Sequence, residues 1–166
     1  MKDIKFKEGN DLFNYRVAAV IELNSKYLFQ KMPNDTNYTL VGGRVHFMET
    51  TKEAVVREVL EEVGYDITDD EFHVAEIAEN FFDYKDNDGV IHKVHTLLFI
   101  YKVNISEQAN ITKDATFVMK DKDNTTLHWL SYDEAKKASI LPSVAKRLLE
   151  EDTLHYEIIN DCKYEK

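Results

Sequence analysis

A chain of 166 residues with 43% hydrophobic residues, two prolines and five glycines is expected to fold as one globular domain and not to remain disordered. Its net charge of −10 at pH 7 disfavours binding to nucleic acid or to anionic membranes, because there is no excess of Lys or Arg to displace counterions. Cys162 is the only cysteine, which excludes an intrachain disulfide and a thiolate zinc cluster. The first residues lack the apolar run of a signal peptide, so a cytoplasmic protein is expected.

The first part of the chain contains short segments rich in β-forming residues. Residues 15–23 and 26–32 are separated by a turn-forming Asn-Ser pair, so they are expected to form a β-hairpin. After a second turn, residues 38–41 are predicted to form a short strand that leads to two consecutive glycines, Gly42 and Gly43.

The next segment has the pattern of an amphipathic helix over residues 53–63. Thr50 is placed to cap its first turn, and Glu53, three residues later, completes a capping box. Gly64 stands where a left-handed residue would end the helix. At about 100° per residue, the apolar side chains fall on one arc that is expected to face the core. These side chains are Val55, Val56, Val59, Leu60 and Val63.

Further strands are predicted beyond this helix. Residues 72–84 and 90–103 are expected to be strands joined by a hairpin turn at residues 86–89, whose sequence is Asp-Asn-Asp-Gly. Residues 104–126 are polar and show little pattern apart from one expected strand at residues 116–119.

The last part of the chain is predicted to contain one more strand and two helices. Residues 127–130 form the expected strand, and Ser131 is a candidate N-cap with an acid three residues later. Pro142 is expected to open a second helix that runs to Glu150. Several strands, a central helix and C-terminal helices predict an α+β domain with a mixed sheet over residues 1–166.

A second arc of the helix at residues 53–63 carries three glutamates: Glu58, Glu61 and Glu62. Like charges three and four residues apart repel each other by roughly 0.2–0.5 kcal/mol per pair, so a helix needed only for solubility would not group them. Grouped carboxylates beside a glycine turn are suited to Mg²⁺ or Mn²⁺. Taken alone, such residues more often form a solvated acidic face.

The spacing of the whole segment resembles the Nudix box, G-x5-E-x7-R-E-U-x-E-E-x-G-U, in which U is a bulky apolar residue. Its fixed positions are occupied by Gly43, Glu49, Arg57, Glu58, Glu61, Glu62 and Gly64. Tyr65 replaces the usual aliphatic residue at the last position. The resemblance covers residues 43–65 and implies an α/β/α sandwich with a mixed β-sheet, in which the box forms a loop–helix–loop.

The resemblance also implies a metal-dependent pyrophosphohydrolase that acts on a small phosphoanhydride. The metal ligands that it implies are the Gly42 carbonyl and the carboxylates of Glu58, Glu61 and Glu62. Glu61 is also the expected general base for the attacking water. Arg57 and Glu49 are expected to form an ion pair that orients the ligands.

Many members of the family hold one more acid outside the box. The candidates here are Glu79, Asp83, Asp86 and Asp88, and the sequence does not choose among them. His92 and His95, three apart in a predicted strand, should point to opposite faces and are not expected to share a metal ion. The aromatic candidates for stacking on a nucleobase, with a place in the core as the alternative, are Phe47, Phe81, Phe82 and Tyr84.

The expected reaction is cleavage of a nucleoside diphosphate linked to another moiety, such as a nucleotide or a nucleotide sugar, with Mg²⁺ or Mn²⁺. Two alternatives stay open: a non-catalytic nucleotide-sensing protein of the same fold, and an isomerase of prenyl diphosphates. The isomerase is disfavoured because no cysteine lies near the box. A homodimer is compatible with the resemblance, and no nucleic-acid or membrane partner is expected.

Overall fold

The computed structural model describes residues 1–122 and 124–164 of the chain. The strands in these residues are β1 (Lys5–Glu8), β2 (Asp11–Leu23), β3 (Lys26–Lys31), β4 (Tyr38–Thr39), β5 (Val41–Arg44), β6 (Glu71–Lys85), β7 (Ile91–Asn104), β8 (Thr116–Val118), β9 (Thr126–Ser131), β10 (Ile140–Leu141) and β11 (His155–Asp161). The helices are α1 (Thr51–Val63), α2 (Tyr132–Lys137) and the 3-10 helix η1 (Ser143–Leu149). No helix in the described part of the chain combines the length and the apolar character needed to cross a membrane.

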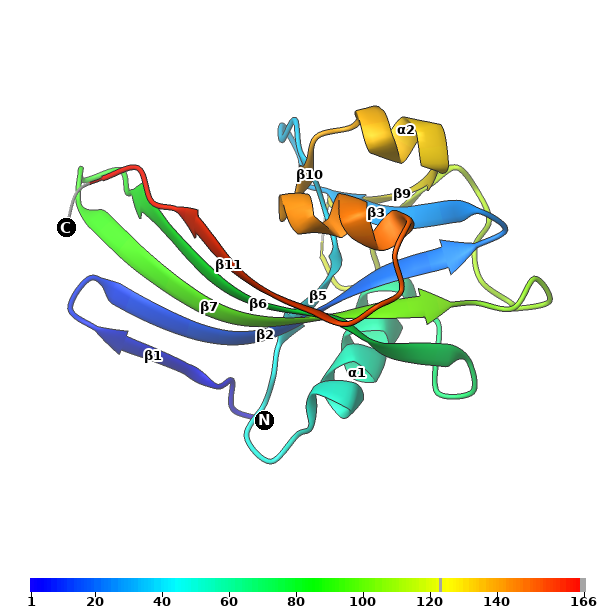
Figure 1. The fold of residues 1–166 in the computed structure, drawn as a ribbon, viewed down its shortest axis with the longest axis horizontal. Helices are drawn as coiled ribbons and strands as arrows, with labels where there is room; N and C mark the ends of the chain where they lie inside the picture. The colour runs from blue at the N-terminus through cyan, green and yellow to red at the C-terminus, as the bar shows by residue number, and fades with distance from the viewer. Residues whose placement is uncertain (123, 165–166) are drawn as a thin grey trace.

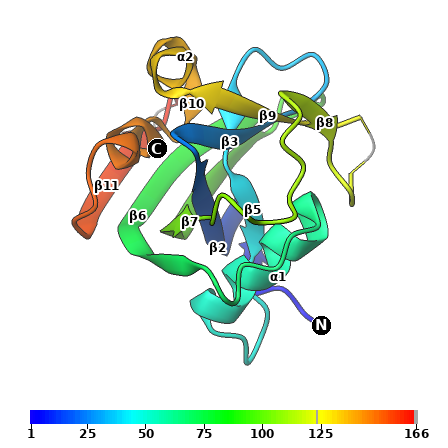
Figure 2. The same ribbon diagram turned by 90° about the vertical axis from the view of Figure 1, so that its right-hand side faces the viewer.

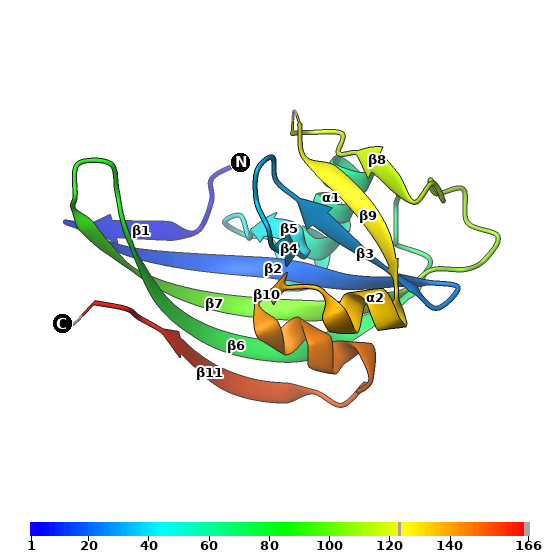
Figure 3. The ribbon, with the colours of Figure 1, turned by 90° about the horizontal axis from the view of Figure 1, so that it is seen from above.

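The long strand β2 organises the sheet. One of its edges pairs in parallel with β7, β7 pairs antiparallel with β6, and β6 carries β11 on its outer edge. The other edge of β2 carries β1, β5 and β3 in succession. Because β2, β6 and β7 are much longer than the helices that cover them, they extend beyond the helices, and β1 and β11 flank this extension (Figures 1 and 3). We call this extended part of the sheet the arm.

Two groups of buried side chains lie on opposite faces of the sheet. One packs between the sheet and α1 and includes Val17 and Val59. The other packs against α2 and η1 and includes Val20, Ile100 and Leu148. Neighbouring positions of β2 thus contribute to different cores, as the two-residue period of a strand requires. With α1 on one face and α2 and η1 on the other (Figure 2), the predicted α/β/α arrangement with a mixed sheet is confirmed.

Most predicted elements are present, and the differences have structural causes. The predicted strand at residues 38–41 divides into β4 and β5, because the two parts pair with different strands. The helix predicted after Pro142 is the 3-10 helix η1. The strands β1 and β11 were not predicted, because they are short or at the sheet edge and their side chains are mostly exposed, with no regular alternation of buried and exposed positions.

The buried side of α1 also differs from the predicted apolar arc. Val59 and Val63 face the core as expected, but Leu60 is 46% exposed. Glu58 and Glu62 are instead buried beside the valines. The prediction for Leu60 was wrong because two carboxylates take part of the buried surface of the helix.

Candidate active site

The start and the end of α1 are fixed by the two caps that the sequence predicts. The Thr50 hydroxyl accepts the Glu53 N–H at 3.2 Å, and the Glu53 carboxylate accepts the Thr50 N–H at 2.8 Å. At the other end, Gly64 has a φ of 78° and donates its N–H to the Leu60 carbonyl at 2.9 Å. The first cap fixes the start of the helix at the loop that precedes it, and the second fixes where the helix ends.

The two glycines of β5 allow α1 to approach the strand closely. Gly42 has a φ of 153°, and a Cβ at this position would lie 2.2 Å from the Val17 carbonyl oxygen. A Cβ at Gly43 would lie 2.2 Å from Oε1 of Glu58. The absence of a side chain at Gly43 therefore leaves the space that the Glu58 carboxylate occupies.

Glu62 is the most deeply buried acid of the box. Its side chain is fully buried, its Oε2 accepts the Gly42 N–H at 2.9 Å, and its Oε1 forms an ion pair with Lys122. Burial raises the pKa of Glu62, and the contacts with Lys122 and Gly42 counteract part of this rise. A fully buried carboxylate needs such a cation beside it.

Arg57 connects four parts of the box. Its Nε and Nη2 donate to the two carboxylate oxygens of Glu49 at 2.7 and 2.9 Å, a bidentate pair. Its Nη2 also donates to the Arg44 carbonyl at 2.9 Å, and its Nη1 donates to Glu58 at 2.8 Å and to Glu61 at 3.2 Å. These hydrogen bonds to Arg57 lower the pKa of Glu49, and the same contacts raise the pKa of Arg57. The predicted pairing of Arg57 with Glu49 is present.

The three glutamates predicted as metal ligands are not equally placed. Glu58 and Glu62 are buried against β5, whereas the Glu61 side chain is 48% exposed and contacts Arg57. Within the described residues, no three carboxylate, imidazole or thiol groups already stand close enough together to hold an ion. Glu61 would therefore have to turn towards the other two to share an ion with them.

The four acids considered outside the box lie on β6 and on the turn that follows it. Glu79 is two residues from Ile77. Ile77 lies opposite Phe99, Phe99 opposite Val17, and Val17 opposite Gly43, so these four residues form one row across the sheet. Asp86 is nine residues from Ile77, which corresponds to roughly 30 Å along the arm at about 3.3 Å per residue. Of the four, Glu79 is nearest to the box in this register.

Of the other three acids, Asp83 and Asp86 accept hydrogen bonds from backbone N–H groups of the arm. Asp83 accepts the N–H groups of Lys163 and Tyr164, each at 2.9 Å. Asp86 accepts the N–H groups of Asp88 at 3.0 Å and Val90 at 2.9 Å, as expected of a turn. Asp88 lies within this turn.

The histidines and aromatic residues near the arm separate onto its two faces. His92 stacks on Tyr84 with ring centroids 4.9 Å apart, and His95 stacks on Phe81 at 4.3 Å. The prediction that the two histidines point to opposite faces is consistent with these separate contacts. Phe47 instead lines a second cavity of about 690 Å³ next to α1, together with Met48, Arg57 and Leu60.

Two features near the box gave little or no signal in the sequence. Lys122 belongs to the polar stretch at residues 104–126, and nothing in that stretch indicates that it reaches Glu62. Arg16 lies directly opposite Arg44 across β2 and β5. Burial and the neighbouring Arg44 lower the pKa of Arg16, and the charges of Glu58 and Glu62 counteract this effect. The two arginines could have been found only if the pairing of β2 with β5 had been known.

Comparisons with known proteins agree with this arrangement. A family model described as the NUDIX domain matches residues 13–151, and no curated protein matches the sequence. A solved structure of a mutator MutT protein from Bacillus halodurans has a TM-score of 0.64 at 20% identity, over 86% of each chain. A NUDIX hydrolase from Nitrosomonas europaea has a TM-score of 0.52 at 18% identity, over 89% of this chain and 79% of that one.

At these identities the two solved structures establish the shared fold, while the family model identifies the relationship. It spans most of the chain and includes the whole box. This protein therefore belongs to the NUDIX family of hydrolases.

Proposed function

We propose that this protein hydrolyses the phosphoanhydride bond of a nucleoside diphosphate linked to another moiety, such as a nucleotide or a nucleotide sugar, with Mg²⁺ or Mn²⁺ as cofactor. The main support is the packing of two buried carboxylates, Glu58 and Glu62, against the backbone of Gly42 and Gly43. Burying carboxylates is costly unless cations compensate their charge, and the basic side chains of Lys122 and Arg57 already lie beside this pair. Their position favours a cation site over a solvated acidic face.

The residues around α1 fit a hard divalent cation. Carboxylate and carbonyl oxygens are the ligands that Mg²⁺ and Mn²⁺ prefer. The groups proposed to hold the ion are the Gly42 carbonyl and the carboxylates of Glu58, Glu61 and Glu62. Lys122 beside Glu62 indicates that a positive charge is needed at this point. When bound, the cation supplies screening of the phosphoryl oxygens and lowers the pKa of a water molecule.

Glu61 is proposed as the general base. It is half-exposed and lacks the backbone contact that holds Glu62, so its carboxylate can reach a water molecule and accept its proton. Arg57 contacts Glu61 at 3.2 Å and Glu58 at 2.8 Å while its other nitrogens hold Glu49. Arg57 is therefore proposed to position both glutamates.

Arg16 and Arg44 are proposed to face the substrate's phosphate groups. Like charges directly opposite each other on neighbouring strands are unfavourable by themselves. An anionic group near both arginines would remove this repulsion. In a chain with a net charge of −10, such a local positive patch would help an anionic substrate to bind.

The proposal treats residues 1–166 as one domain. The proposed compartment is the cytoplasm, because a chain with one cysteine gains no disulfide from an oxidising environment. A homodimer stays a prediction.

The test is cleavage of a panel of nucleoside diphosphate derivatives with Mg²⁺ or Mn²⁺, measured for the wild type, Glu61→Gln and Glu53→Gln. Glu61→Gln is expected to lower kcat by about 10²- to 10⁴-fold, because the general base is lost. Glu53→Gln is the control, because Glu53 lies on the same helix and a glutamine keeps the capping box. The activity of this variant is expected to equal that of the wild type. Undiminished activity of Glu61→Gln would show that the general base is assigned wrongly.

Two further measurements separate the alternative functions. Nucleotide binding measured by calorimetry with metal present, but without turnover of any substrate, would indicate a sensing protein. A rearranged prenyl diphosphate, without release of phosphate or pyrophosphate, would indicate the isomerase.

A further inference from the structure

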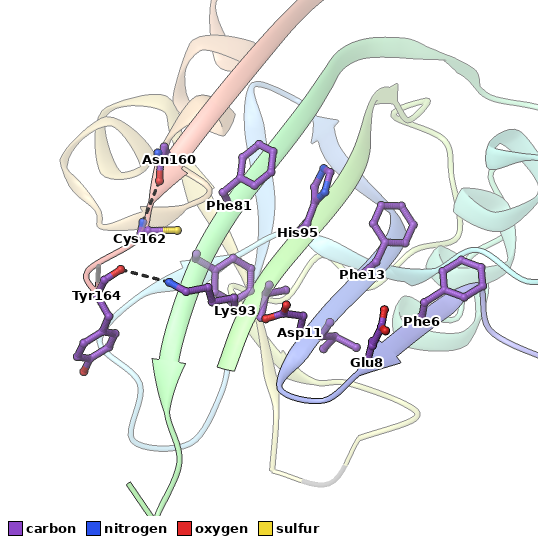
Figure 4. A pocket seen from close by; sticks show the side chains of 13 residues that line it. Phe6, Glu8, Asp11, Phe13, Phe81, Lys93, His95, Asn160, Cys162 and Tyr164 are labelled. Atoms are coloured by element: carbon purple, nitrogen blue, oxygen red, sulfur yellow. Dashed lines mark hydrogen bonds between the residues drawn. The ribbon is translucent and has the colours of Figure 1, made fainter. Parts of the chain in front are cut away.

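The arm carries a cavity of about 530 Å³ on the face of the sheet that α1 covers further along. This volume lies within the range of small-molecule sites. The strands β1, β2, β7 and β6 form its floor, and the segment after β11 forms one wall (Figure 4). Phe13, which lines it, is four residues along β2 from Val17, the partner of Gly43, so the cavity begins about 13 Å from the box.

A continuous row of rings crosses the floor of this cavity. Phe6, Phe13, His95 and Phe81 occupy opposite positions on β1, β2, β7 and β6. The ring centroids are 6.0 Å apart for Phe6 and Phe13, 5.3 Å for Phe13 and His95, and 4.3 Å for His95 and Phe81. We call these four residues the aromatic row. Since Phe6 is 58% exposed and the others are half-buried, the row gives the cavity an aromatic surface against which a planar group can pack.

A charged row lies next to the aromatic row, towards the end of the arm. Lys93 Nζ lies 3.7 Å from a carboxylate oxygen of Asp83 and donates to the Tyr164 carbonyl at 3.2 Å. Asp83 in turn accepts the Lys163 N–H. Both side chains are therefore held by each other and by the segment after β11. Glu8 and Asp11 are exposed and lie directly opposite each other across β1 and β2. Two opposed carboxylates repel each other, and a ligand with hydrogen-bond donors would relieve that repulsion.

Much of the cavity lies outside the part of the chain that the family model covers. The model begins at residue 13 and ends at residue 151. The lining residues beyond these limits include Phe6, Glu8, Asp11, Asn160 and Tyr164. The cavity is therefore formed jointly by the matched domain and by residues on either side of it.

We propose that this cavity is a second ligand site, separate from the hydrolytic site, that binds an amino-substituted nucleobase as part of an uncharged nucleoside. The base would pack against the aromatic row, and its amino group would donate to Glu8 or Asp11. A phosphate group is disfavoured there, because both free charges are negative and Lys93 is already paired. This proposal does not depend on the hydrolytic function.

The test is calorimetric titration of the whole chain with adenosine and with AMP, in EDTA so that no divalent ion takes part. Adenosine is expected to bind saturably and AMP more weakly. Phe81→Leu is expected to weaken adenosine binding by about fivefold or more, because a stacking partner is lost. Tyr84→Leu is the matched control, since Tyr84 lies on the same strand and also stacks on a histidine, but outside the cavity. Its affinity is expected to equal that of the wild type.

A charge reversal, Asp11→Lys, tests the acidic edge. Asp11 is exposed at the start of β2, so this variant is expected to fold, and it should reverse the order of the two ligands by weakening adenosine and strengthening AMP. The absence of saturable adenosine binding by the wild type would overturn the proposal. Binding that survives Phe81→Leu and Asp11→Lys but is lost in Glu58→Gln would also overturn it, by locating the nucleoside at the box.

Discussion

A side chain at Gly42 would meet different neighbours from one at Gly43. We therefore expect substitution of Gly42 to affect mainly stability and substitution of Gly43 to affect mainly metal binding. A Cβ at Gly42 would collide with the backbone of Val17, at a φ that L-residues rarely adopt, whereas the atoms nearest to a Cβ at Gly43 belong to the carboxylate of Glu58. We expect Gly42→Ala to lower the free energy of unfolding by roughly 2–4 kcal/mol. Gly43→Ala should lower it by less than about 1 kcal/mol but should displace Glu58 and weaken Mn²⁺ binding by about 10- to 100-fold.

Urea denaturation and calorimetric titration with Mn²⁺ would check both substitutions. Equal losses of stability in the two variants would contradict the assignment of the Gly43 space to the Glu58 carboxylate.

Arg57 is the residue of the box for which a substitution that keeps the charge is most informative. Its fork holds Glu49 through two nitrogens and leaves Nη1 for Glu58 and Glu61. A lysine keeps the positive charge but cannot make this set of contacts. We expect Arg57→Lys to lower kcat and Mn²⁺ affinity by about 10- to 100-fold, while circular dichroism shows an unchanged fold. A variant with wild-type Mn²⁺ affinity would mean that the ligands are oriented without Arg57.

Residues of the box could be predicted from the sequence because they lie close together in it. Glu49 and Arg57 are separated by less than three helical turns, so their pairing follows from one capped helix and one loop. Lys122 and Arg16 could not be predicted, because their positions depend on strand pairings and loops formed over long sequence distances. The box residues thus follow from local structure, and their charged neighbours follow from the tertiary fold.

The elements show the same division. The helix α1 was predicted with both its caps, because a capping box and a terminal glycine act within one turn. The strand β11 was missed, because it lies at the edge of the sheet and most of its side chains face solvent. The position of β11 is determined by its pairing with β6 and by the contacts of the segment that follows it. Neither can be recognised from the spacing of apolar residues in the sequence.

The contacts of Asp83 make the docking of that segment sensitive to acid. Burial alone would raise the pKa of Asp83, but the N–H groups of Lys163 and Tyr164 and the charge of Lys93 lower it below its usual value. The stabilising contribution is therefore complete above the unfolded-state pKa of about 3.9 and is lost as the pH falls through the lower folded-state pKa. We expect the NMR amide shifts of Lys163 and Tyr164 to move towards unfolded values in that range.

Two controls sharpen the pH experiment. The Cys162 N–H donates to the neutral side chain of Asn160 at 3.2 Å, so its direct hydrogen bond involves no titrating group. In Asp83→Asn the acidic transition at Lys163 and Tyr164 should disappear. A transition that persists in this variant would assign the effect to another acid.

At the scale of the whole molecule, charge and stability are linked through the box. The chain carries a net charge of −10, and α1 buries two carboxylates of which one, Glu62, has a pKa raised by burial. Burying these charges costs stability that a bound cation can restore. The metal-free protein is therefore expected to have a lower free energy of unfolding than the protein with a cation bound at this site.

This cost can be measured without any substrate. A ligand that binds only the folded state at 100 times its Kd adds about 2.7 kcal/mol, and each kcal/mol raises the Tm of a chain of this size by about 2–4 °C. Saturating Mn²⁺ should thus raise the wild-type Tm by roughly 5–11 °C. Glu58→Gln should show little rise, and Glu53→Gln, on the same helix but away from the buried pair, should match the wild type. An equal rise in all three proteins would mean that the cation stabilises the chain from outside the box.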